Sequence, residues 1–264
     1  PPMTLRVNRG QASRDDYIGS LKGHGIAAEA GCLSKHAIQL AVPIDVWDLP
    51  EFSAGRVSVQ DEAAQMAALL LQAGAGERVL DACAAPGGKT CHILELQPEL
   101  AELVAMDIDE LRLQKVSENL QRLNLKATLI TGDAASPPAA LEPASFDRIL
   151  VDAPCSASGV IRRHPDVKLL RRESDIAPLA DQQLCILRGL WPLLKTGGTL
   201  LYATCSILDE ENSQVIQRFL TEEGDAALSD TEMAGSESVT SGRQLLPSSG
   251  GTDGLFYATL KKAG

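Results

Sequence analysis

Apolar residues follow two alternating patterns from Arg56 onward: short runs of strand length, and longer stretches with helical spacing. This alternation is typical of a parallel sheet whose strands are joined by crossover helices, so we expect an α/β fold. Strands are predicted at residues 78–82, 103–106, 127–130, 148–151, 199–203 and 255–260, and helices at 61–71, 88–96, 109–123, 174–194 and 209–220. Residues 221–251, rich in Ser, Gly and acidic side chains, are predicted to be a mobile loop.

The first 55 residues have a different pattern. Strands are predicted at residues 4–7 and 37–42, with a helix over 13–21 between them. We expect residues 1–55 to form a small basic α/β subdomain of the RRM type, and residues 56–264 to form the main domain. The basic residues that suggest this character are Arg6, Arg9, Arg14, Lys22 and Lys35.

Composition narrows the class of protein. The chain has 264 residues, 44% of them hydrophobic, which is enough for one sizeable core. It has no apolar run of the roughly 18 to 20 residues that a membrane helix needs, and its start lacks a signal-peptide core, so we expect a monomeric protein of the cytoplasm without membrane partners. The six cysteines and four histidines lack the spacing of disulfide frameworks or metal sites, so reduced thiols and no metal are expected.

The net charge of −11 argues against a polyanionic partner, but its distribution matters more than its sum. Residues 160–172 contain five Lys or Arg and one Asp, a local charge of +4. Much of the acid lies in Asp209-Glu210-Glu211 and between residues 222 and 237, where we expect it to be solvated, away from any ligand.

Two cysteines stand at the ends of predicted strands. Cys155 closes Asp152-Ala153-Pro154-Cys155 after strand 148–151, and Cys205 follows strand 199–203. Open α/β sheets bind ligands at the carboxyl ends of their strands, so both thiols are expected to face one bound substrate. The alternative is that both are small buried hydrophobic residues.

Residues 79–90 run from a strand through a Gly-rich turn into a helix. Such a turn lets a ligand approach the backbone at the positive end of the helix. A P-loop would need Gly where Cys83 stands, and the dinucleotide pattern GxGxxG is absent. These residues therefore indicate a nucleoside cofactor without a pyrophosphate.

Acidic residues after the next two strands refine this hypothesis. Asp107 is placed to accept from ribose hydroxyls, and Asp133 from the amino group of an adenine. Together with the turn they describe S-adenosylmethionine, although each Asp alone is often only a helix cap or a turn residue. The expected cofactor-binding residues are Cys83, Ala84, Ala85, Pro86, Gly87, Gly88, Lys89, Asp107, Asp133 and Asp152.

Residues 81–90, 152–156 and 203–206 resemble the three signature motifs of the Sun (Fmu) family of RNA cytosine-5 methyltransferases. Residues 159–166 and 6–8 resemble the bacterial members that act on 16S ribosomal RNA. The resemblance spans nearly the whole chain and implies a class I, Rossmann-like methyltransferase fold with a mostly parallel seven-stranded sheet. Those members also have an amino-terminal NusB-like RNA-binding domain; the chain lacks one and begins on Pro1, so we expect it to be a fragment.

The resemblance also implies catalytic roles. Carbon 5 of cytosine is a weak nucleophile, so a thiolate must first add to carbon 6. The family uses the Thr-Cys thiol, which makes Cys205 the nucleophile; Cys155 then assists product release, and Asp152 protonates ring nitrogen N3. Spacing alone leaves the two cysteine roles open, because DNA cytosine-5 methyltransferases use the Pro-Cys thiol.

Arg162, Arg163, His164 and Lys168 are expected to bind RNA phosphates around an extruded base. With nine aromatic residues, a platform that stacks several bases is not expected. Lys89 is expected to meet the cofactor or substrate, the alternative being an ordinary lysine on a helix surface. Two other functions remain open: a non-catalytic protein that binds ribosomal RNA, and a methyltransferase for another substrate, such as tRNA, an amino group or a small molecule.

Overall fold

The computed structural model describes residues 1–229 and 232–264. The helices are α1 (Arg14–Gly23), α2 (Glu62–Leu71), α3 (Gly88–Leu96), α4 (Glu110–Arg122), α5 (Val167–Leu170), α6 (Ile176–Leu190) and α7 (Ser213–Glu222). The main sheet contains β5 (Arg78–Ala82), β6 (Glu102–Asp107), β7 (Thr128–Thr131), β8 (Phe146–Asp152), β9 (Leu194–Thr204), β10 (Ala226–Ser229), β11 (Glu237–Val239), β12 (Gly242–Leu245) and β13 (Leu255–Lys262). Among the described helices, none is long and apolar enough to cross a membrane.

The main sheet has the expected parallel centre. Its order is β11-β12-β13-β9-β8-β5-β6-β7, with β10 also paired to β13. Strands β9, β8, β5, β6 and β7 run parallel, and β13 is antiparallel to β9. Over the described residues the sheet has nine strands, where seven were expected. The difference arises partly because β10, β11 and β12 form in the segment 221–251. The prediction of a loop is therefore wrong for much of this segment; residues 230–231 lie outside the described residues.

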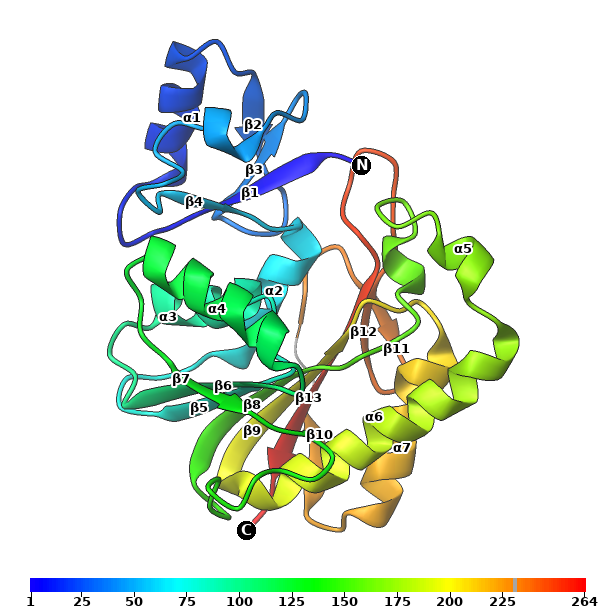
Figure 1. Cartoon of the computed structure of the whole chain (residues 1–264). Coiled ribbons are helices and arrows are strands. Elements are labelled where there is room, and N and C mark those ends of the chain that lie inside the picture. The colour runs from blue at the N-terminus through cyan, green and yellow to red at the C-terminus, as the bar shows by residue number, and fades with distance from the viewer. Residues whose placement is uncertain (230–231) are drawn as a thin grey trace.

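The sheet is the middle of three layers. Helices α2, α3 and α4 cover one face, and α6 and α7 cover the other (Figure 1). Successive strand residues alternate between the two cores: Leu80 and Ile149 pack in the core that contains α6, and Val79 and Leu150 in the core that contains α2. This period of two is what a strand buried on both faces requires.

Helix starts are fixed by residues that the sequence already indicates. The Asp61 carboxylate accepts from the Ala63 N–H at 2.9 Å and so caps α2. Helix α3 begins after Gly87, whose φ is +97° and whose added Cβ would lie 3.1 Å from Val116. Only glycine adopts this backbone close to α4 without strain, so the turn from β5 into α3 needs a glycine there.

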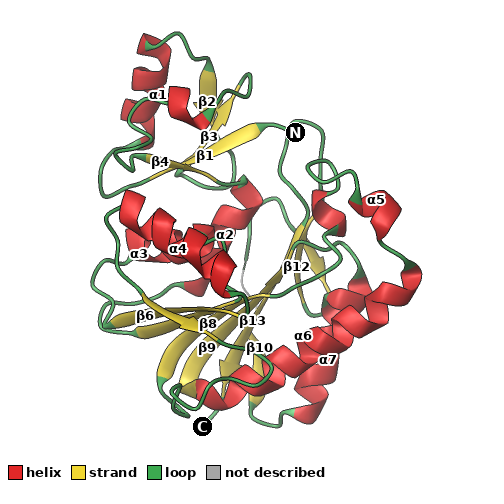
Figure 2. Cartoon of the chain, viewed as in Figure 1, coloured by secondary structure: helices red, strands yellow, loops and turns green. Residues whose placement is uncertain are grey.

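The N-terminal subdomain is a four-stranded antiparallel sheet with α1 packed beside it (Figure 2). Its strands, in the order β2-β3-β1-β4, are β1 (Met3–Val7), β2 (Ala28–Ala30), β3 (Ala37–Leu40) and β4 (Val57–Val59). Because β4 pairs with β1, this sheet continues past the expected boundary at residue 55. Residues 1–55 hold five Lys or Arg and six Asp or Glu, a net charge of −1, so the expectation of a basic subdomain is wrong.

Arg6 joins this subdomain to the main domain. Its side chain is fully buried, and its guanidinium forms two hydrogen bonds to the Glu95 carboxylate, at 2.8 and 2.9 Å. A third reaches the carbonyl of Gly88 at 2.8 Å. The small sheet therefore braces the first residue of α3, directly behind the Gly-rich turn.

Candidate active site

Cys155 and Cys205 meet at the carboxyl end of the sheet. Strands β8 and β9 are parallel neighbours with Asp152 opposite Ala203, so the turns that follow them lie side by side. The two sulfur atoms are 3.3 Å apart. The structure thus brings together the two thiols that the strand-end positions pointed to.

The two thiols differ in acidity. The hydrogen bond with Cys205 and burial raise the pKa of Cys155 well above its ordinary value. The same hydrogen bond lowers the pKa of Cys205; burial and the negative charge of Asp152 oppose this effect, and the positive charge of Lys89 adds to it. Of the two thiols, Cys205 is therefore the more readily ionised and the better candidate for the nucleophile.

Lys89 and Asp152 form an ion pair beside the thiols. Lys89 lies in the first turn of α3, and its ammonium is 2.6 Å from the carboxylate of Asp152 at the end of β8. Burial alone would lower the pKa of Lys89, but the charge and hydrogen bond of Asp152 outweigh burial and raise it. The Lys89 side chain is only 14% exposed, so the alternative of a surface lysine is wrong.

A cavity of about 300 Å³ opens next to this group. Of the ten expected cofactor residues, five line it: Cys83, Ala85, Asp107, Asp133 and Asp152. Ala84, Pro86, Gly87, Gly88 and Lys89 belong to the turn and the start of α3 but do not line the cavity. Eight lining residues were not among the expected site residues: Ile108, Arg112, Gly132, Ala134, Ala153, Pro154, Gln182 and Ile186.

The lining fits a nucleoside. Asp107 is nearly buried and accepts from the Ala85 N–H at 3.0 Å and the Asp109 N–H at 3.2 Å, so its carboxylate is fixed at the cavity. Asp133 is exposed, and one of its oxygens accepts from Ala135. Ile108 adds an apolar wall that is 66% exposed. The volume lies at the lower end for small-molecule sites.

Arg162 and Arg163 are engaged within the protein. Each guanidinium forms an ion pair with Asp253 at 2.5 Å, and Arg163 also reaches Asp61 at 2.9 Å. They therefore hold the segment before β13 against the start of α2. The expectation that both arginines bind RNA phosphates stays a prediction. His164 and Lys168 are exposed, and their role remains a prediction.

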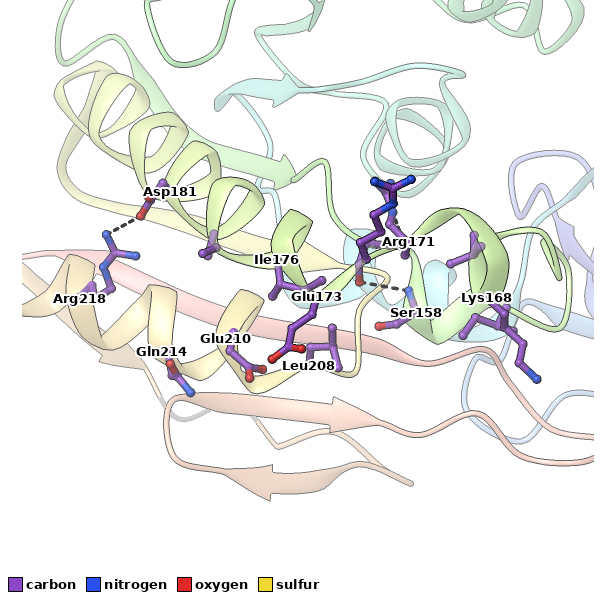
Figure 3. Close-up of a pocket in the computed structure, with 16 residues that line it drawn as sticks. Ser158, Lys168, Arg171, Glu173, Ile176, Asp181, Leu208, Glu210, Gln214 and Arg218 are labelled. Carbon is purple, nitrogen blue, oxygen red and sulfur yellow. Dashed lines mark hydrogen bonds and ion pairs between the residues drawn. The ribbon is translucent and has the colours of Figure 1, made fainter.

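Lys168 lines a second cavity, of about 600 Å³, together with Ser156, the residue after Cys155 (Figure 3). Ser158 of the Cys155 turn lines it too, as does Arg171, which donates to the carbonyl of Ser156 at 3.0 Å. Arg218 in the same cavity is paired with Asp181 at 2.8 Å. Lys168 and Arg171 thus place positive charge next to the cysteine turn.

Glu211 is a residue beside the cysteine turns that sequence reasoning placed wrongly. It was expected in a solvated acidic run, yet its side chain is completely buried and accepts hydrogen bonds from Ser156 and Ser206. The only local signal is that each cysteine is followed by a serine. Nothing in the sequence indicates that one acid reaches both serines.

The fold and the cavity at its strand ends are those of a class I methyltransferase. A family model described as 16S rRNA methyltransferase RsmB/F matches residues 68–261, and a model of the RsmF/B-like ferredoxin-like domain matches residues 1–47. The chain therefore belongs to the RsmB/F family.

Relatives and solved structures agree with this assignment. The chain is 53% identical to ribosomal RNA small subunit methyltransferase B of Photorhabdus laumondii, over 99% of this chain and 60% of the relative. The same protein of Shewanella oneidensis is 54% identical, with coverages of 100% and 61%. The chain thus spans about 60% of the length of these curated relatives. A methyltransferase homologue from Pyrococcus horikoshii is 31% identical with a TM-score of 0.85, over 99% of this chain and 86% of that one.

Proposed function

We propose that this protein transfers a methyl group from S-adenosylmethionine to carbon 5 of one cytosine in 16S ribosomal RNA, through a covalent adduct with Cys205. The observation that carries the proposal is the thiol pair at 3.3 Å, with an acidified Cys205, beside the Lys89–Asp152 ion pair. The curated relatives are named as small-subunit ribosomal RNA methyltransferases, which supports this substrate.

The nucleoside cavity is proposed to hold S-adenosylmethionine, whose sulfonium supplies the electrophilic methyl group when bound. Asp107 binds the ribose hydroxyls, and Asp133 accepts from the adenine amino group. Cys83 and Ala85 place the turn backbone against the ligand. The fixed carboxylate of Asp107 and the exposed one of Asp133 support these roles.

In the proposed reaction the Cys205 thiolate adds to carbon 6, which makes carbon 5 nucleophilic. Asp152 faces N3, and its pair with Lys89 holds the proton delivered there. The proton on carbon 5 must then leave before Cys205 is expelled. Cys155, 3.3 Å from Cys205, is placed to assist this step.

RNA is proposed to bind through its phosphates at His164, Lys168 and Arg171, around an extruded base. Lys168 and Arg171 line the cavity next to the Cys155 turn. The proposal includes a monomer in the cytoplasm, a reducing compartment; all six cysteines are free thiols, which is consistent with it.

Methyl-labelled S-adenosylmethionine and unmodified 16S ribosomal RNA test the proposal. We expect label in 5-methylcytosine at a single position, and no label with Cys205→Ala. Label on another atom of the base, or RNA binding without any incorporation, would contradict it; the second result would favour the non-catalytic RNA-binding protein.

A further inference from the structure

One buried carboxylate lies behind both cysteine turns. Glu211 is the last residue of the short 3-10 helix Asp209–Glu211, between β9 and α7, and its side chain is completely buried. One carboxylate oxygen, Oε1, accepts from the Ser156 N–H at 2.7 Å and from the Gln183 amide at 3.2 Å. The acid is therefore fixed to the Cys155 turn through its backbone.

The other oxygen connects the two turns. Glu211 Oε2 accepts from the Ser156 hydroxyl at 2.5 Å and from the Ser206 hydroxyl at 2.6 Å. Ser156 directly follows Cys155 and Ser206 directly follows Cys205. The two serine oxygens are 3.3 Å apart, as are the two cysteine sulfur atoms. The same carboxylate thus holds both turns one residue away from their thiols.

We propose that Glu211 is a positioning residue that sets the spacing of Cys155 and Cys205 for the methyl-transfer reaction. It acts through Ser156 and Ser206 and needs no contact with substrate or cofactor. This inference rests on the proposed function, because the proposed methyl transfer is what requires the two thiols at this spacing.

Burying the Glu211 carboxylate costs free energy, which indicates that this acid has a specific role. A buried carboxylate loses its hydration, and hydrogen bonds offset only part of that loss. Within the described residues, no Lys or Arg nitrogen lies within ion-pair distance of Glu211. An apolar side chain would fill the space without this cost, but it would not join two serines and a backbone amide.

The charge of Glu211 also favours a protonated Cys155. The pKa of Cys155 is raised first by its hydrogen bond with Cys205 and by burial, and the negative charge of Glu211 acts in the same direction. A protonated Cys155 can donate to the Cys205 thiolate. The carboxylate therefore supports the thiol pair by geometry and by charge.

The surrounding contacts keep Glu211 itself in place. The Tyr202 hydroxyl donates to the Glu211 carbonyl at 2.8 Å. The neighbouring Asn212 donates to the Ser206 carbonyl at 3.0 Å and accepts from the Thr204 hydroxyl at 2.6 Å. Both sides of the Cys205 turn are thus tied to the segment that carries the acid.

Glu211→Ala, Glu211→Gln and Ser206→Ala test the inference, with Glu118→Gln as the control, because Glu118 is an exposed acid of α4 that lines neither cavity. For folded Glu211→Ala we expect kcat to fall about 100-fold, the loss typical of reacting groups displaced by about 1 Å, with KM for RNA and cofactor within about threefold. Glu211→Gln keeps the shape and should recover part of kcat. Ser206→Ala, which removes one hydroxyl, should show a smaller loss in the same direction.

A second readout needs neither RNA nor cofactor. The pH midpoint of Cys205 alkylation by iodoacetamide, followed by peptide mass spectrometry, should rise in Glu211→Ala, because Cys155 no longer stabilises the thiolate. Lys89 and Asp152, the charged groups beside Cys205, are unchanged in that variant. Circular dichroism tests whether the variants are folded. If Glu211→Ala does not fold, Ser206→Ala replaces it in both measurements.

An unchanged alkylation midpoint in folded Glu211→Ala and Ser206→Ala would overturn the inference, whatever the wild-type activity. An equal loss of kcat in Glu118→Gln would do the same, because the effect would then not depend on the buried hydrogen bonds. Absence of methyl transfer by the wild-type chain would instead overturn the proposed function alone.

Discussion

Asp81, a buried acid near the end of β5, makes the free energy of unfolding depend on pH. One oxygen accepts from the Thr90 hydroxyl at 2.6 Å, and the other has no hydrogen-bond partner among the described residues. Burial, the main cause, raises the pKa of Asp81 to about 7. The folded protein therefore keeps this proton at pH values where the unfolded chain has released it.

Asp81→Asn should stabilise the protein more at pH 8 than at pH 5. The stability that Asp81 contributes is present below its ordinary pKa near 3.8 and is lost as pH rises to about 7. Asn does not titrate, so the advantage of the variant grows by at most about 1.4 kcal/mol per pH unit within that window. Urea unfolding at both pH values measures it, with exposed Asp15→Asn as control. An equal gain in the free energy of unfolding of Asp81→Asn at pH 5 and pH 8 would contradict the raised pKa of Asp81.

Which site residues could be predicted depended on what fixes each position. Cys155, Cys205 and Asp152 follow apolar strands, and the ends of parallel strands meet wherever the sheet forms. Glu211 is fixed by Ser156, 55 positions away, so its burial has no local pattern. The sequence pattern likewise suggests that Arg162 is a free cation, because its ion-pair partner Asp253 is distant in the sequence.

At the scale of elements, Gly159 packs the cysteine turns against the segment before β13. Its N–H donates to the Cys205 carbonyl at 2.9 Å, and its own carbonyl accepts from the Gly254 N–H at 2.9 Å. A Cβ at this position would lie 2.1 Å from the Gly254 carbonyl oxygen. Backbone contacts this close leave no room for any side chain.

Gly159→Ala should therefore lower the free energy of unfolding by about 1–3 kcal/mol, the usual cost of an overpacked site. Gly19→Ala, in α1 with nothing within 4 Å of the added methyl, should raise it by about 0.5–1 kcal/mol. Denaturant unfolding of both variants provides the comparison. If Gly159→Ala is as stable as wild type, the backbone packing described here is incorrect.

Long periodic elements were predictable, and short ones were not. Helices α2, α3 and α4 and strands β5, β6 and β8 lie where apolar spacing and capping residues put them. Strands β2, β4 and β11 have three residues each, too few to show a period of two. They exist because a neighbouring strand pairs with them, as β1 does with β4.

At the scale of the whole molecule, the Arg6–Glu95 pair joins the small sheet to helix α3 of the main domain. Both side chains are almost completely buried, so removing one leaves the other charge without a partner. Arg6→Ala should cost about 3–5 kcal/mol of stability. Arg56→Ala, whose partner Glu51 is exposed, should cost less than about 1 kcal/mol. Unfolding free energies test the contrast, and similar values for the two variants would contradict the bracing role of Arg6.

The measurement that tests the central claim most directly is the covalent adduct in the presence of 16S ribosomal RNA and S-adenosylmethionine. If Cys205 attacks and Cys155 assists release, Cys155→Ala should accumulate a protein–RNA adduct on denaturing gels, and peptide mass spectrometry should locate it at Cys205. Cys205→Ala should form none. An adduct that accumulates in Cys205→Ala, linked through Cys155, would contradict the account.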